Sequence, residues 1–359
     1  MYTQAVPSSA LARKLGAVAA GTKIPFRVVL ADGTVIGNRG ASPAFTLTFR
    51  TRSAELRTVA YGYVGLLESY IAGGVDIDGD IALAVRAGSE SGYNRAPNLL
   101  LRLRNRWHEW RFSNRSIAQA KANARYHYGL GEAFYRYWLD TAGMMYTCAY
   151  WAEGTSTLEQ AQKNKMDHVC RKVRLEAGET FVDVGCGWGG LLFHAWENYG
   201  ALGTGINTTT EQVAELRAEL ARRGLTDKIG LVGTRDTELF IRKYIFPGGW
   251  IPSLAQAIDW MERCGLEVLE IENLRRHYAL TLDAWGERFD RNWNAIHALD
   301  PHRFDEAFRR SWRAYLWSCA DVFRSTLDLN LFQVTVSKGN VGTGYPMSRS
   351  FLYRPPDKP

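Results

Sequence analysis

The chain has 359 residues, enough for one large domain or two of ordinary size. With 46% hydrophobic and 23% charged residues, its composition is that of a globular protein and excludes a disordered chain. The formal net charge of +7 indicates an anionic partner surface, either nucleic acid or anionic lipid.

The cysteines and the apolar runs limit where the protein works. Five cysteines are scattered without a C-x-x-C pair, which argues against a disulfide framework and against structural zinc and favours a reducing cytoplasm. The sequence has no apolar run of about 18 residues, the length needed to span a bilayer. We therefore expect a soluble protein whose contact with a membrane is peripheral.

Residues 1–95 predict a small α+β domain. An Asp32-Gly33 pair between two apolar runs is typical of a turn that joins two strands. The run DIDGD (76–80) resembles a calcium loop, but it lacks the ligand spacing of one, so we expect a surface turn. The expected elements are strands at 26–30, 35–37 and 45–49 and a helix across 54–74.

Residues 96–124 predict a basic linker. Seven Arg and Lys residues stand between Arg102 and Arg125 against one acid, Glu109, and Trp107 and Trp110 lie among them. Such a segment is either a solvated linker helix or a basic, tryptophan-bearing surface that lies on anionic head groups. The sequence leaves both interpretations open.

The stretch Thr180–Gly190, TFVDVGCGWGG, is typical of a nucleotide pocket. A β-type run reaches Asp183, a glycine-rich turn follows, and a helical run begins directly after it. The G-x-G-x-G spacing fits the nucleoside-binding loop of S-adenosylmethionine (AdoMet) methyltransferases better than a pyrophosphate loop. An ordinary tight turn between strand and helix is the alternative.

The chain after this loop predicts an α/β fold, a Rossmann-like doubly wound sheet that follows the small N-terminal α+β domain. Strands and helices alternate up to residue 233, as parallel sheets require. The expected strands are 181–184, 201–207, 229–233, 266–272 and 332–338, and the expected helices are 190–199, 208–224, 253–264 and several across 278–325.

Five motifs together resemble the cyclopropane-fatty-acyl-phospholipid synthase family, which includes mycolic acid cyclopropane synthase-like AdoMet methyltransferases. They are YTCAYW (146–151), VDVGCGWGG (182–190), KYIFPGGWIPSL (243–254), LRRHYALTLDAWGERF (274–289) and CADVFRSTLDLNLFQVTVSKG (319–339). The resemblance implies a catalytic domain over 125–359 that adds a methylene from AdoMet to the cis double bond of a phospholipid acyl chain. It also implies a homodimer at the inner face of the cytoplasmic membrane.

The resemblance also implies roles for individual residues. Cys148 and Tyr278 correspond to the site of a bicarbonate ion that acts as the base. Cys319 corresponds to a proposed catalytic cysteine, although its place on a helix beside Trp317 and Phe323 favours a buried and inert thiol. Asn207 stands where the family usually has threonine. The implied cofactor-binding residues are Tyr146, Thr147, Asp183, Gly185, Gly187, Trp188, Gly189, Asn207 and Gln212.

One departure from the family follows Gly233. The family has two further strands there, with a Phe-Glu-His-Val-Gly run and a His-Thr-Ile-Gly run, and neither run occurs in this sequence. Lys243, in the next family motif, follows after only nine residues. We expect either an internal deletion or an omitted segment, and therefore either a break in the chain near 233–238 or a sheet that lacks its middle strands.

Three alternatives to the leading hypothesis remain. The same acyl chain could receive a methyl branch, or the protein could be a catalytically inactive lipid-binding relative, which the missing strands favour. A nucleic-acid methyltransferase agrees with the basic charge, but the sequence has no N/D-P-P-Y type motif and no recognised nucleic-acid module.

Overall fold

The computed structural model describes residues 10–38, 42–91, 99–112, 130–207, 210–233, 252–325, 329–342 and 344–353. The chain forms two compact units, Met1–Arg111 with Trp293–Thr326, and Phe112–Asn292 with Leu327–Pro359. Within the described residues, no helix is long and apolar enough to cross a membrane.

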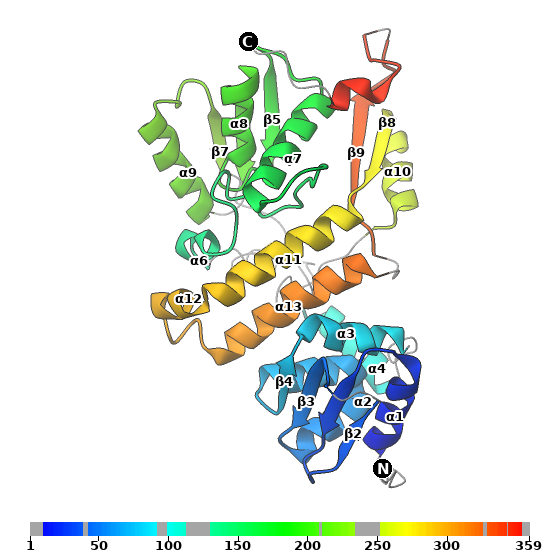
Figure 1. Cartoon of the computed structure of the whole chain (residues 1–359). Helices are drawn as coiled ribbons and strands as arrows, with labels where there is room; N and C mark the ends of the chain where they lie inside the picture. The colour runs from blue at the N-terminus through cyan, green and yellow to red at the C-terminus, as the bar shows by residue number, and fades with distance from the viewer. Residues whose placement is uncertain are drawn as a thin grey trace. The chain divides into compact units, whose positions relative to one another are not determined.

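A four-stranded sheet lies at the centre of the first unit (Figure 1). The strand order is β2-β1-β3-β4, with β1 and β3 parallel and both outer pairs antiparallel. The predicted Asp32-Gly33 turn is confirmed, because Gly33 has a φ of 85°. The elements are α1 (Ala10–Gly21), β1 (Phe26–Val29), β2 (Val35–Gly37), β3 (Phe45–Phe49), α2 (Arg52–Ile71), β4 (Val75–Gly79), α3 (Ile81–Glu90) and α4 (Leu99–Phe112).

The run DIDGD forms a strand, so the prediction of a surface turn was wrong. Most of it belongs to β4, where Leu47 of β3 stands opposite Ile77. Asp80 then accepts hydrogen bonds from the backbone N–H groups of Ala82 and Leu83 at the start of α3. Alternation of Val75 and Ile77 with aspartates is a half-buried strand pattern, and the acidic composition concealed it.

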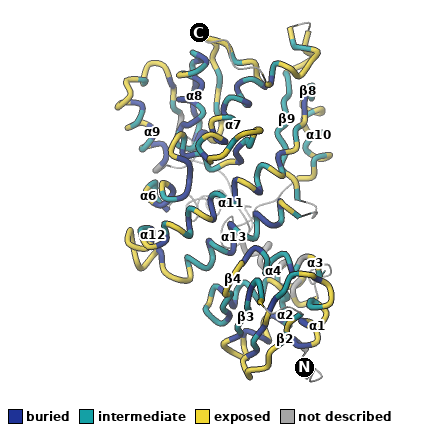
Figure 2. The backbone as a smooth tube through the Cα atoms, in the orientation of Figure 1, coloured by how far each residue is buried: buried dark blue, intermediate teal, exposed yellow. Residues whose placement is uncertain are grey.

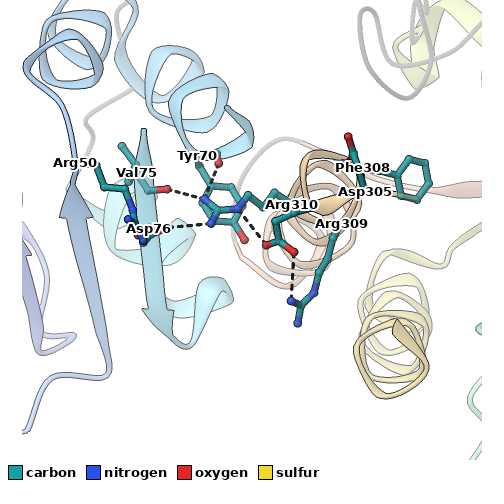
Figure 3. A network of polar contacts seen from close by, with 9 residues as sticks. Arg50, Tyr70, Val75, Asp76, Asp305, Phe308, Arg309 and Arg310 are labelled. Carbon is teal, nitrogen blue, oxygen red and sulfur yellow. Dashed lines mark hydrogen bonds and ion pairs between the residues drawn. The ribbon is translucent and has the colours of Figure 1, made fainter. Parts of the chain in front are cut away.

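The first unit also includes α12 (Trp293–Leu299) and α13 (Glu306–Arg324). Figure 3 shows how Arg310 of α13 donates to the carbonyl oxygens of Tyr70 and Val75, at 3.0 and 3.1 Å, and to Asp76 Oδ1 at 2.9 Å. Arg86 of α3 similarly pairs with the buried Asp321, at 2.8 Å. The units therefore differ from the predicted division at 95 and 125, because these contacts assign residues 293–326 to the N-terminal unit.

The second unit contains a parallel sheet of order β5-β6-β7, which confirms the predicted strand–helix alternation. Gly203 and Gly205 of β6 lie against Leu192 of α8, so this helix covers their face of the sheet. Leu216 of α9 belongs to the same apolar cluster. The elements are α6 (Glu132–Arg136), α7 (Leu158–Lys172), β5 (Thr180–Val184), α8 (Gly190–Tyr199), β6 (Leu202–Asn207), α9 (Thr210–Arg223) and β7 (Gly230–Gly233).

The remaining strands of this unit form a separate antiparallel pair, β8 (Leu266–Asn273) with β9 (Phe332–Lys338). They are accompanied by α10 (Leu254–Arg263), α11 (Arg275–Arg291) and the short helix η1 (Arg349–Tyr353). In the described part of the chain, β5 pairs with β6 alone, and Val182 and Val184 are 60% and 78% exposed. Residues 234–251 lie outside the described residues, so the lost segment itself stays a prediction.

Candidate functional site

The glycine loop after β5 has the backbone geometry that its sequence predicts. Gly185, Gly187 and Gly189 have φ values of 89°, 53° and 84°, in the region that residues with a side chain rarely adopt. Gly189 also caps α8, where an added Cβ would lie 2.6 Å from Leu216 Cδ1. Gly185 and Gly187 have open space around the Cβ position, which leaves room for a ligand against the backbone.

Two further predicted cofactor residues lie next to this loop, Asn207 on the neighbouring strand β6 and Gln212 on α9. The side-chain amide of Asn207, at the end of β6, donates to the carbonyl oxygen of Gly187 at 2.9 Å and to Gln212 Oε1 at 3.0 Å. Both side chains are buried. Asn207 thus connects β6, the glycine loop and α9, and the structure brings three separate sequence positions together.

The segment before α7 approaches the same loop closely. Gly143 and Gly190 lie so near each other that a Cβ on Gly190 would be 2.5 Å from the carbonyl oxygen of Gly143. The fully buried carboxylate of Asp140 accepts hydrogen bonds from the N–H groups of Gly143 and Met145, both at 2.7 Å. This turn places the predicted residues Tyr146 and Thr147 beside the start of α8.

Lys165 on α7 is a site residue that the sequence did not reveal. Its ammonium is buried and donates to Thr147 Oγ1 at 2.9 Å. Burial lowers the pKa of Lys165 to about 8, although Asp140, Cys148 and Asp183 attract its charge. Burial likewise raises the pKa of Asp183, and Lys165 opposes that shift. A buried cation therefore lies against two of the predicted cofactor residues.

Aromatic side chains join the predicted residues Tyr146 and Tyr278. The ring of Trp285, on α11, lies 5.3 Å from that of Tyr146 and 6.0 Å from that of Tyr278. Trp188 of the glycine loop contacts Tyr135, and its indole N–H donates to Glu215 at 2.7 Å. The rings that form this aromatic cluster are Phe134, Tyr135, Trp138, Tyr146, Trp188, Tyr278, Trp285 and Phe289.

The two predicted catalytic cysteines occupy different units. Cys148 is buried in the second unit, where its thiol lies 3.2 Å from the carbonyl oxygen of Ala149 and 3.9 Å from that of Leu274. Burial raises its pKa to about 12, so the group is a neutral hydrogen-bond donor at physiological pH. Cys319 lies half-buried on α13 in the first unit, and burial raises its pKa to about 12 as well. Its catalytic role stays a prediction.

A second polar cluster connects α7 to the β8–β9 pair. Lys172 contacts Glu272 at 2.6 Å, Glu270 at 3.1 Å and Gln333 at 2.9 Å, and His168 contacts Glu272 at 2.8 Å. Burial would raise the pKa of Glu272, but the hydrogen bonds from His168 and Lys172 outweigh it and lower the pKa to about 2. Across the described ranges, no group of three or more His, Cys, Asp or Glu residues is arranged to hold a metal ion.

Comparison with known proteins first gives the class. A parallel sheet with a glycine loop after β5 is the fold of AdoMet-dependent methyltransferases, and the cyclopropane synthase MmaA2 from Mycobacterium tuberculosis shares it with a TM-score of 0.54. That structure is 21% identical and the match covers 60% of this chain and 97% of MmaA2. At this identity the likeness shows the fold.

A family model then gives the family. The model described as mycolic acid cyclopropane synthetase matches residues 115–237 and 230–334, so the chain belongs to this family. A probable fatty acid methyltransferase of Pseudomonas putida is 30% identical over 92% of this chain and 97% of its own length. The cyclopropane-fatty-acyl-phospholipid synthase of Escherichia coli K12 is 28% identical, with 85% and 90% covered.

The alignment with the Pseudomonas putida relative extends over 394 positions but includes only 92% of this chain, so part of that relative has no counterpart here. The two stretches that the family model matches overlap at residues 230–237.

Proposed function

We propose that this chain uses AdoMet to transfer a methylene group to the cis double bond of an unsaturated phospholipid acyl chain and so forms a cyclopropane fatty acid. The observation that carries the proposal is the joining of the glycine loop to the aromatic cluster through Trp188 and Tyr135, whose rings lie 5.1 Å apart. A ligand on the loop would therefore meet an apolar, aromatic wall. Family membership agrees with this substrate class.

The residues present fit AdoMet. The loop permits close backbone approach at Gly185 and Gly187, and Thr147 with Lys165 supplies a polar, cationic partner for a carboxylate. Two buried polar atoms at this site, Gln162 Oε1 and Trp285 Nε1, have no hydrogen-bond partner within the described residues. When bound, AdoMet would supply an electrophilic methyl group on its sulfonium.

The aromatic cluster would favour the reaction in two ways. An alkene is a weak nucleophile, so its chain must be held close to the methyl donor and water must be kept out. The buried rings of Trp138 and Trp285 exclude water, and aromatic faces stabilise a cation that forms near them. Tyr146 and Tyr278 would border the acyl chain from the same cluster.

The residues present fit a bound bicarbonate ion only in part. The protonated thiol of Cys148 and the phenol of Tyr278 are donors that suit a bound anion. The Glu and His of the two missing family runs, which would orient the ion as a base, are absent from the sequence. Cys148 and Tyr278 would hold the anion, and we assign no proton-transfer step to it.

One observation favours a second candidate function, a lipid-binding relative without catalysis. Val182 and Val184 of β5 are exposed, although a central strand of a parallel sheet is normally covered on both faces. A chain without its middle strands could keep the loop and the aromatic cluster yet lack the base. A methyl-branched product is the other outcome on the same acyl chain.

Two measurements test the proposal. Titration calorimetry should show AdoMet binding that Gly187→Val abolishes, because valine is strained at a φ of 53°. Gly178→Val, at another positive-φ glycine with open space around it, is the matched control and should keep binding. Lipid analysis of expressing cells should show cyclopropane acyl chains. AdoMet binding with unmodified lipids would instead support the inactive relative, and unchanged binding by Gly187→Val would refute the loop assignment.

A further inference from the structure

Helix α4 exposes a group of large apolar side chains. Leu99, Leu100, Leu103 and Trp107 are 70%, 57%, 56% and 60% exposed. Leu99, Leu103 and Trp107 follow one another at intervals of four, and Leu100 stands three residues before Leu103. Residues three and four apart share one face of an α-helix, so these side chains form a continuous stripe.

Arginines border this apolar stripe on both sides. Arg104 stands four residues after Leu100 and three before Trp107, and it pairs with Glu68 of α2 while its guanidinium lies 4.7 Å from the centre of the Tyr61 ring. On the other border, Arg102 and Arg106 each stand three residues after a leucine of the stripe, and both are exposed. Arg104 therefore attaches α4 to α2, while the stripe and the other two arginines remain accessible.

We propose that this face of α4 docks on an anionic phospholipid surface, with the stripe among the upper acyl chains and Arg102 and Arg106 at the phosphates. An apolar stripe that carries tryptophan and is bordered by arginine suits the membrane interface, where rings and guanidinium groups lie at head-group depth. The proposal rests on the proposed function in one respect, since the acyl chain to be modified lies in a bilayer.

Other occupants fit this surface less well. A second copy would bring Arg102 and Arg106 against the same positive charges, which is unfavourable unless acids intervene. An acidic protein would pair with the arginines, but only a lipid surface offers negative charge and a deep apolar layer together. The net charge of +7 adds a long-range attraction towards anionic lipid.

The test uses the full chain and sedimentation with vesicles. Binding should be measurable on equimolar phosphatidylglycerol and phosphatidylcholine and weak on phosphatidylcholine alone, and it should fall as salt rises. The double variant Leu103→Ser/Trp107→Ser should lower the partition coefficient at least roughly tenfold, because two large apolar groups no longer insert. Arg102→Gln/Arg106→Gln should lower it roughly tenfold at low salt, with no effect on neutral vesicles.

Matched controls lie on α2 of the same unit. Leu56 is 59% exposed and Arg57 beside it is also exposed, so Leu56→Ser and Arg57→Gln change a leucine and an arginine at exposures similar to those of Leu103 and Arg102. Both should bind vesicles like the parent chain. Thermal unfolding of every variant checks that it is folded. If the apolar variant does not fold, the arginine variant alone decides the test.

The outcomes separate this proposal from the proposed function. Undiminished binding by the α4 variants, or equal losses in the α2 controls, would overturn the docking surface. Vesicle binding that depends on α4 in a chain that modifies no lipid would support the surface and contradict the cyclopropane chemistry. If the chain makes cyclopropane lipids but its α4 variants bind vesicles normally, the result would support the cyclopropane chemistry and contradict the docking surface.

Discussion

The sheets of the two units contain similar apolar strands, but the side chains of these strands are exposed to different degrees. In the first unit, Val28 and Phe45 are 0% and 3% exposed. In the second, Val182 and Val184 of β5 are 60% and 78% exposed. None of the residues of α10 is buried, as the lighter colours of this helix in Figure 2 show. An apolar strand pattern thus indicates a strand, whereas its burial depends on what packs over it.

The difference lies in which faces have a covering layer. Helix α13 contributes, together with α1, α2 and α3, to one apolar cluster around β1 and β3. In the second unit, Phe181 packs into the clusters that contain residues of α8, whereas Val182 and Val184 alternate onto the opposite face of β5. That face is the one that the helices following further strands would cover in a doubly wound sheet.

The largest expected effect is the difference in stability loss between a buried strand residue of the first unit and an exposed strand residue of the second. Phe45→Ala should lower the free energy of unfolding of the first unit by about 3–5 kcal/mol, because it removes a buried ring stacked 5.5 Å from Phe26. Val182→Ala should change the stability of the second unit by less than about 0.5 kcal/mol, because that side chain is already exposed. Urea titrations in which each unit is followed separately measure both values. Comparable losses in the two units would contradict the comparison.

The sequence predicted those residues of the candidate site that belong to a recognisable motif. The glycine loop follows from its spacing, and Asn207 and Gln212 follow from the resemblance. Lys165 was not predicted as a site residue, because a lysine on an amphipathic helix normally indicates a solvated face. Only the packing of α7 against Asp140 and Thr147 buries it. The position of Trp285 was not predicted either, because its ring partners Trp138 and Tyr146 come from a distant segment.

The assignment of α13 illustrates a second limit. The sequence predicts helices across 278–325, and α13 is one of them. Nothing local shows that Arg310 will meet Asp76 and the carbonyl oxygen of Tyr70, more than 230 residues away along the chain. Long-range partners of this kind determine the units, and a single sequence does not display them.

The next effect concerns the ion pairs that tie β8 and β9 to α7. The pKa of Glu272 is about 2 in the folded protein against 4.5 for an unperturbed glutamate. Its stabilisation is therefore complete above pH 4.5 and is lost as the pH falls towards 2. The difference corresponds to at most about 3 kcal/mol, and solvent screening reduces it because this carboxylate is only half-buried. Acid unfolding of the second unit should show this loss, and Glu272→Gln should flatten the pH dependence.

Glu176 provides the control for this acid transition. Its side chain is 72% exposed and its nearest cation, Arg174, lies 3.8 Å away. Glu176→Gln should leave the acid transition where it is, because an exposed ion pair contributes little. An acid transition that is the same in the parent and in Glu272→Gln would mean that the buried cluster does not hold the two parts of this unit together.

The smallest expected effect tests whether the outer face of β5 is bare in solution. Val184→Lys should change the free energy of unfolding by less than about 0.5 kcal/mol, because the side chain is 78% exposed and stands opposite Ile206 on the same open face. A charge on an apolar patch should also reduce association between copies. The matched substitution Val28→Lys, at a fully buried position of the first unit, should prevent folding. A loss of several kcal/mol from Val184→Lys would instead show that a covering segment lies against β5, and an intact mass above the 40.4 kDa of this sequence would show that the segment is absent from it.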